Sequence, residues 1–137
     1  MSGTRQSSPD TLLQQGIQLD QAGQHDAAAD LYRQILEQKP DHAYALHLLG
    51  AGALRRGDFD AAVELISAAI KANAKEAVFH LFLGQALQER GELNEALAAY
   101  DHALSLAPQL ASAMYRRATV LMALHQVSEA MDGFRQA

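Results

Sequence analysis

Several residue types are absent or scarce in this chain, and each absence excludes a class of protein. There is no cysteine, which excludes disulfide scaffolds, thiolate catalysis and cysteine-ligated metal sites. No uninterrupted apolar run approaches the roughly 18–20 residues that span a bilayer, so no membrane helix is expected. The first ten residues are polar, carry a single arginine and contain no apolar segment, which does not match a signal peptide.

The charge of the chain is modest and slightly acidic. Its 137 residues include 11 basic and 16 acidic side chains, for a formal net charge of −5. This balance weighs against nucleic acid as the main partner, because phosphate binding needs a basic stripe. Apolar residues make up 49% of the sequence and aromatic residues 6%, which suits helices packed through small side chains. These features predict a cytoplasmic protein with no membrane or nucleic-acid partner.

What the sequence does contain is a repeat with a period of 34 residues. Four five-residue segments begin 34 positions apart, at Leu12, Leu46, His80 and Met114. Glycines, alanines, large apolar residues and prolines recur in the same rhythm: Gly23, Gly57 and Gly91; Ala28, Ala62, Ala96 and Ala130; Tyr32, Ile66, Tyr100 and Phe134; Pro40 and Pro108. A fixed period of this size is typical of a helical solenoid, which offers a shaped surface and usually no chemistry of its own.

Each unit reads as two antiparallel helices. In the third unit, helical apolar spacing over residues 77–90 is interrupted at Gly91 and resumes over residues 94–106. Glycine supplies the left-handed backbone that often ends a helix, and Pro108 closes the unit because proline cannot continue one. Residues that can cap a helix N-terminus stand where each second helix should begin: Asp26, Asp60, Asn94 and Ser128. The predicted helices are 10–22, 26–38, 43–56, 60–72, 77–90, 94–106, 111–124 and 128–137.

Small residues recur where the paired helices should approach most closely. They are Gly16, Gly50, Gly84 and Ala118 on the first helices, and Ala28, Ala62, Ala96 and Ala130 on the second helices. Because no side chain stands between them, the two backbones can come close together. Larger residues are expected to fill the layers between successive units: Leu19, Leu87, Leu121, Tyr32, Ile66, Tyr100 and Phe134. A single unit cannot bury its apolar face alone, so stacked neighbours stabilise one another.

These phased residues resemble the motif of the tetratricopeptide repeat family. The third unit matches at Leu83, Gly84, Leu87, Ala96, Tyr100 and Pro108, and the second at Leu46, Leu49, Gly50, Ala62 and Ile66. The resemblance implies an all-α fold, an α-solenoid of antiparallel helix pairs in a right-handed superhelix with about 3.5–4 repeats. It divides the chain into a disordered tail, residues 1–8, and a repeat domain, residues 9–137, with repeats 9–42, 43–76, 77–110 and a truncated 111–137.

The fourth unit departs most from the motif. Arg117 and Ala118 stand in place of the usual Leu-Gly, and His125 takes the place of the turn glycine. The sequence ends at Ala137, part-way through the expected second helix, where Phe134 would lie on a bare terminal face. We therefore expect a piece of a longer protein, similar to the N-terminal repeat regions of bacterial family members. The alternative is a short protein that covers this end by forming a homodimer.

No catalytic or metal site is indicated by the residue pattern. His42 and His47 are five positions apart and do not share a helical face, and no His-x3-His or HExxH arrangement occurs. His80 occupies an apolar slot of the motif and reads as a packed histidine. Serine and aspartate residues are scattered without a matching base. No catalytic residue, metal ligand or cofactor is therefore predicted.

The resemblance implies a binding surface instead. In this family the first helices of successive repeats line a concave groove that commonly holds an extended peptide or a partner helix. The groove residues expected from the register are Tyr44, His47, Leu48, Val78, Phe82, Gln85, Tyr115 and Arg116. Leu48 and Phe82 are apolar in a slot that is often polar in the family, and exposed apolar patches usually mark interaction sites. Arg116 and Arg117 have no acidic residue close to them in sequence, which predicts a local positive patch.

Two binding modes of the family find no counterpart here. Chaperone-binding members grip a terminal carboxylate with polar and basic residues, but those slots hold Leu13, Ile17, Leu48, Val78 and Phe82. Relatives of O-linked N-acetylglucosamine transferase carry an asparagine ladder, and those slots read Gln14, Leu48, Phe82 and Arg116. We therefore expect a non-enzymatic scaffold that binds a protein or peptide through apolar contacts. Two alternatives are the substrate-positioning arm of a larger glycosyl-, methyl- or sulfotransferase, with its catalytic domain beyond residue 137, and a self-association module.

Overall fold

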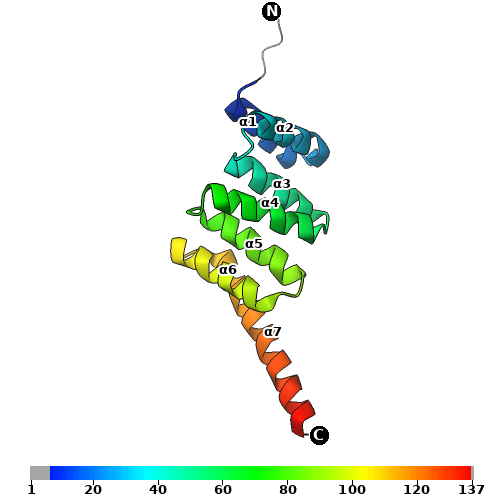
Figure 1. The fold of residues 1–137 in the computed structure, drawn as a ribbon, viewed down its shortest axis with the longest axis vertical. Coiled ribbons are helices and arrows are strands. Elements are labelled where there is room, and N and C mark those ends of the chain that lie inside the picture. The colour runs from blue at the N-terminus through cyan, green and yellow to red at the C-terminus, as the bar shows by residue number, and fades with distance from the viewer. Residues whose placement is uncertain (1–6, 137) are drawn as a thin grey trace, which may run out of the picture. The chain divides into compact units, whose positions relative to one another are not determined.

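The fold consists of helices throughout the residues that the structure describes. The computed structural model describes residues 7–136, with side chains described as far as Asp132, and contains no strand in that range (Figure 1). The helices in this range are α1 (Pro9–Gln21), α2 (His25–Gln38), α3 (Ala43–Arg55), α4 (Phe59–Ala72), α5 (Ala77–Glu89), α6 (Leu93–Leu106) and α7 (Ala111–Gln136). They form two compact units, α1 to α4 and α5 to α7. The prediction of an all-α fold is confirmed.

The first six predicted helices are observed to within one residue at each end. Glycine explains where the first helix of each pair stops, because Gly23, Gly57 and Gly91 have φ angles of 81°, 82° and 79°. Residues with a side chain rarely adopt this left-handed conformation. After α1, the amide of Gln24 donates to the carbonyl of Leu19 at 2.8 Å, which satisfies a carbonyl at the helix end. The equivalent bond follows α3 and α5.

The start of α1 is fixed by its own capping residues. The Oγ atom of Ser8 accepts a hydrogen bond from the amide of Thr11 at 3.2 Å. Pro9 follows in the first turn, where the N–H that proline lacks would have no helical partner. The predicted disordered tail, residues 1–8, lies outside the described residues except for Ser7 and Ser8.

The predicted N-caps of the second helices are wrong in position. The caps of α2, α4 and α6 are Gln24, Asp58 and Glu92. The Asp58 side chain accepts a hydrogen bond from the amide of Ala61 at 3.3 Å. Asp26 and Asp60 lie within the first turn instead, where the helix dipole stabilises a carboxylate. Ser128 lies inside α7.

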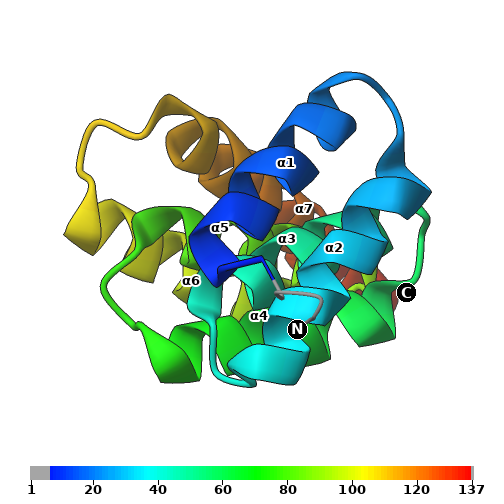
Figure 2. The ribbon, with the colours of Figure 1, turned by 90° about the horizontal axis from the view of Figure 1, so that it is seen from above.

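Each complete hairpin is closed by a large side chain of its second helix, which lies on a glycine of its first helix. α1 and α2, for example, lie side by side in Figures 1 and 2. The pairs are Gly16 with Tyr32, Gly50 with Ile66, and Gly84 with Tyr100. A Cβ atom on Gly84 would lie closer than 3.0 Å to carbons of the Tyr100 ring. The predicted close approach is confirmed. Tyr32 fills its own hairpin and also belongs to a buried cluster that includes Ala45 of the next unit, which agrees with the predicted packing between successive units.

The predicted turn of the fourth unit does not form. α7 is continuous, so the two helices expected over residues 111–137 are one. His125 occupies the turn position, and a positive φ is strained for a residue that has a Cβ atom. Its Nε2 atom lies 3.0 Å from Oε1 of Glu129, one helical turn further on. Ala130 is exposed, while Ala137 and the side chain of Phe134 lie outside the described residues.

Candidate interaction surfaces

In the first unit, α3 presents three of the predicted groove residues on one face. Tyr44, His47 and Leu48 have the spacing i, i+3 and i+4, which places them on the same side of the helix. Tyr44 is 42% exposed, and its ring meets that of His47 edge to face with the centroids 6.4 Å apart. Leu48 is half-buried and packs against the hydrophobic core of this unit. Tyr44 is therefore the most accessible of the three.

His47 packs behind Tyr44 and is largely removed from solvent. Its side chain is 5% exposed, and burial lowers its pKa from the ordinary 6.5 to about 4. The ring is therefore neutral near pH 7. This face of α3 therefore presents an aromatic ring and an apolar side chain rather than a charged histidine.

The second unit carries the other five predicted groove residues. Val78, Phe82 and Gln85 follow one another at i, i+4 and i+7 along α5, so they share a face, and each is half-buried. Tyr115 on α7 is 74% exposed. α5 and α7 contact each other within this unit. The unit therefore combines a half-buried, mainly apolar stripe on α5 with the exposed aromatic ring of Tyr115 on α7.

Arg116 and Arg117 of α7 both lie near side chains of α6. The Nε atom of Arg117 donates to Oδ1 of Asp101. Burial raises the pKa of Tyr100 to about 12, and the charge of Arg116 acts against this rise. The hydroxyl of Tyr100 donates to Oε1 of Gln88 at 2.7 Å. The predicted positive patch is therefore reduced, because Asp101 of another helix pairs with Arg117.

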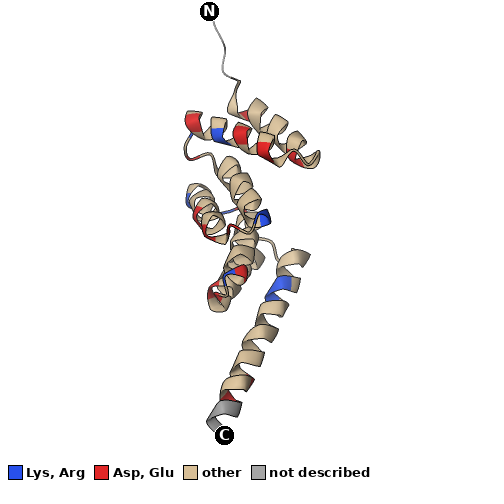
Figure 3. Cartoon of the chain, turned by 90° about the vertical axis from the view of Figure 1, so that its right-hand side faces the viewer, with Lys and Arg blue, Asp and Glu red and all other residues tan. Residues whose placement is uncertain are grey.

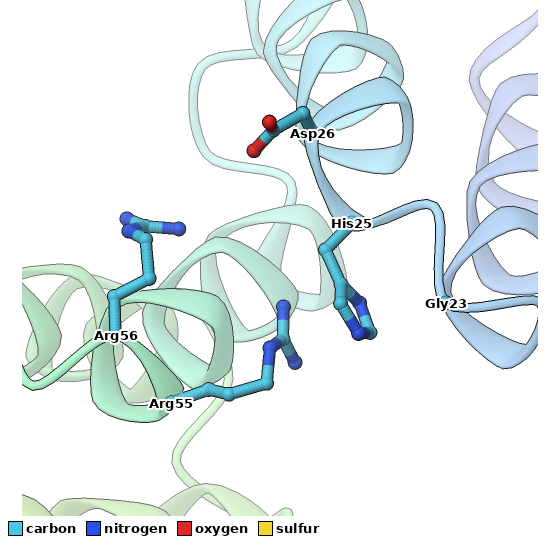
Figure 4. Close-up of a pocket in the computed structure, with 5 residues that line it drawn as sticks. All are labelled: Gly23, His25, Asp26, Arg55 and Arg56. Carbon is cyan, nitrogen blue, oxygen red and sulfur yellow. The ribbon is translucent and has the colours of Figure 1, made fainter.

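A pocket that the sequence analysis missed lies in the first unit. It has a volume of about 280 Å³ and is lined by Gly23, His25, Asp26, Arg55 and Arg56. Figure 4 shows the Arg55 side chain directed toward His25, and Arg56 directed toward Asp26. An adjoining hollow of about 360 Å³ shares Asp26 and Arg56 with it. Acidic and basic groups face each other here, so the pocket lacks the single sign of charge that selects an ion.

One carboxylate orders the wall of this pocket. Asp20 accepts a hydrogen bond from the hydroxyl of Tyr32 at 2.6 Å and lies 2.9 Å from Nδ1 of His25. Burial, together with this hydrogen bond, raises the pKa of Tyr32 above its ordinary value. Asp20 and Tyr32 are 12 residues apart, and the same spacing recurs in the hydrogen bond between Gln88 and Tyr100. That recurrence is the signal from which sequence reasoning could have found the network.

Charge is distributed unevenly among the helices. Figure 3 shows several acidic residues along α2, whose charged side chains are Asp26, Asp30, Arg33 and Glu37. α3 and α5 each contain one charged residue, Arg55 and Glu89, at their last positions. No helix in residues 7–136 is both long enough and apolar enough to cross a membrane. The first helices α3 and α5 thus present surfaces almost without charge.

Comparison with a known family covers most of the described chain. Two overlapping segments, residues 21–86 and 53–110, match the family model described as tetratricopeptide repeat. The matched region runs from the end of α1 to the end of α6. It contains all three glycine-closed turns.

Solved structures share the fold. A mutant O-GlcNAc transferase from Thermobaculum terrenum is 26% identical with a TM-score of 0.81, over 88% of this chain and 23% of that one. The first TPR of Spaghetti bound to an HSP90 peptide is 21% identical with a TM-score of 0.82, and the match covers 86% of this chain and 96% of that domain. MamA from Desulfovibrio magneticus is 22% identical with a TM-score of 0.78, and the match covers 94% of this chain and 73% of that one. This chain therefore spans about a quarter of the transferase chain.

Proposed function

Because the chain belongs to the tetratricopeptide repeat family, we propose that the faces of its first helices bind an extended peptide or a helix of a protein partner. The observation that carries this proposal is the near absence of charge on α3 and α5. A helix at the surface of a protein normally has charged residues on the side that faces water. Here the accessible positions are aromatic or apolar, as at Tyr44, Leu48 and Phe82. Apolar surface of this kind marks an interaction site.

The partner segment we expect is amphipathic, with apolar side chains directed at the scaffold. The Spaghetti domain is bound to a peptide, which supports a peptide as the ligand class. Leu13, Ile17 and Leu48 are half-buried apolar residues in the slots where other members grip a carboxylate. Tyr115 adds a ring whose accessible area suits contact with an apolar side chain. We place this interaction in the cytoplasm.

Removing two apolar side chains should weaken peptide binding strongly. A ligand is first selected from a random peptide library, and its Kd is then measured by calorimetry. The double change Leu48→Ser with Phe82→Ser is expected to raise that Kd by about 30-fold, since truncating a buried anchor costs about 2 kcal/mol.

Leu48 also packs against the core, so the fold of the variant must be checked by circular dichroism and thermal melting. The matched control is Leu106→Ser, which removes a 43% exposed leucine from a second helix and should leave the Kd unchanged. An unaltered Kd in a folded double variant would contradict the proposed surface. Loss of helical structure would show instead that these two residues belong to the core.

A second candidate function rests on the transferase comparison. At 26% identity over 88% of this chain, the repeats resemble about a quarter of a larger enzyme chain. In this second hypothesis, the faces of the first helices hold a substrate protein in position for a catalytic domain. The repeats themselves perform no chemistry. The open reading frame that contains this sequence decides between the two. A transferase domain after residue 137 favours the arm, and a stop codon directly after that position excludes it.

A further inference from the structure

The first half of α7 leaves open the positions that the other first helices bury. In the second hairpin, Leu46 is 9% and Ala53 0% exposed, and in the third, His80 and Leu87 are 6% and 7% exposed. Their equivalents 34 residues on are much more accessible: Met114 is 53% and Leu121 40% exposed. Ala118, which takes the place of the buried hairpin glycines, is exposed as well. The surface that a second helix covers in the other hairpins is vacant here.

The second half of α7 carries the complementary face. Ala28, Ala62 and Ala96 are each fully buried in their hairpins, whereas Ala130 is exposed. Val127 and Met131, which occupy second-helix positions of the repeat, are 51% and 52% exposed. Both surfaces are apolar, and both recur in phase with surfaces that pack together elsewhere in the chain. α7 is therefore an opened hairpin whose two halves would fit each other.

A straight helix cannot bring its own two halves together. Leu121 and Met131 are ten residues apart, which corresponds to about 15 Å along an α-helix. Closing the hairpin within one chain requires a turn at His125, where the other units use a glycine with positive φ. The contact between Nε2 of His125 and Oε1 of Glu129 spans the same position and favours continuation of the helix.

We propose that two copies of the chain exchange the second halves of α7. The half beginning near Val127 of one copy would lie on Met114, Ala118 and Leu121 of the other, and the reverse contact would form by symmetry. Exchange of an identical element between two copies satisfies both surfaces with contacts that the fold already uses. The occupant of the vacant surface is thus a second copy of this chain. This dimer is independent of peptide binding by the first-helix faces.

Light scattering across a concentration series tests the exchange. We expect the mass of a dimer rather than the 14.8 kDa of one chain. Met131→Glu should raise the dimer dissociation constant by at least about tenfold, because it places a charge in the exchanged contact. Ser128→Glu is the matched control, since the equivalent positions Asp26, Asp60 and Asn94 are exposed, and it should leave the dimer unchanged. A monomer at every concentration, or a dimer equally stable in both variants, would overturn the proposal.

Engineered cysteines distinguish exchange from closure within one chain, because the native sequence has none. Gly84 lies on Tyr100, and the same antiparallel register places Leu121 opposite Met131. Chains with Leu121→Cys and chains with Met131→Cys, refolded together, should form a mixed disulfide between copies. If the double variant instead forms its disulfide within a single chain of monomer mass, the hairpin closes on itself and the exchange is wrong. His125→Gly should shift the population from dimer toward that closed monomer.

Discussion

Replacing Gly84 with leucine is expected to lower the free energy of unfolding by about 3 kcal/mol. Even a single added carbon would lie closer than 3.0 Å to the Tyr100 ring. That ring is fully buried, and its hydroxyl is held by Gln88 at 2.7 Å, so it cannot turn aside without losing a hydrogen bond. The loss is a large share of the roughly 5–15 kcal/mol that stabilise a domain of this kind. Urea denaturation followed by circular dichroism measures the free energy of unfolding. The value for Gly84→Ala is expected to lie between those of Gly84→Leu and the parent protein.

Gly52 provides the matched control. It is also a buried glycine in a first helix, but a Cβ atom there would meet only the ends of the Arg55 and Arg56 side chains, at 3.4 Å. These ends are flexible and can move. Gly52→Ala should therefore stabilise the protein by about 0.5–1 kcal/mol through helix propensity alone. Equal effects of alanine at Gly84 and Gly52 would show that the assigned contact with Tyr100 is wrong.

Acid is expected to destabilise the protein through His47. Its pKa is about 4 in the folded protein and 6.5 in the unfolded chain, so the ring is neutral in both states above pH 6.5. Between pH 6.5 and 4 the unfolded chain binds a proton that the folded protein does not, and stability falls with decreasing pH. The expected loss by pH 4 is about 3 kcal/mol. Denaturation at a series of pH values gives this dependence directly.

The variant His47→Gln isolates this contribution, because glutamine does not titrate. Its absolute stability at pH 7 will differ from that of the parent, so the comparison concerns the change with pH. Carboxylates also titrate near pH 4, and they contribute to both proteins in the same way. The parent should lose more stability than the variant between pH 6.5 and 4. Identical pH profiles would contradict the burial of a neutral His47.

The repeat in the sequence predicted the helices well because backbone chemistry recurs with it. Gly23, Gly57 and Gly91 are needed for left-handed turns, and their spacing located six helices to within one residue. The same logic failed in the fourth unit. Motif phasing alone placed a turn at His125, but a residue with a Cβ atom gives the backbone no reason to leave the helix. The sequence itself carries this difference, since His125 stands where the other units have Gly23, Gly57 and Gly91.

The candidate site was less predictable, because it depends on contacts between helices. Tyr44 and Tyr115, which the register predicts in the groove, are 42% and 74% exposed. The register did not reveal that His47 is buried, with 5% of the residue exposed. The pairing of Arg117 with Asp101 joins α7 to α6 across 16 positions, which no local charge count detects. The pocket beside His25 and Arg55 also brings together residues 30 positions apart.

Amide chemical shifts measured with and without the selected peptide test the proposed function most directly. We expect the shifts that change on binding to lie in α1, α3, α5 and the first half of α7, with large changes around Tyr44 and Phe82. The second helices α2, α4 and α6 should change little, because they carry the charged surfaces. Changes concentrated on α2, α4 and α6, with α3 and α5 unaffected, would contradict the claim that first-helix faces form the binding surface.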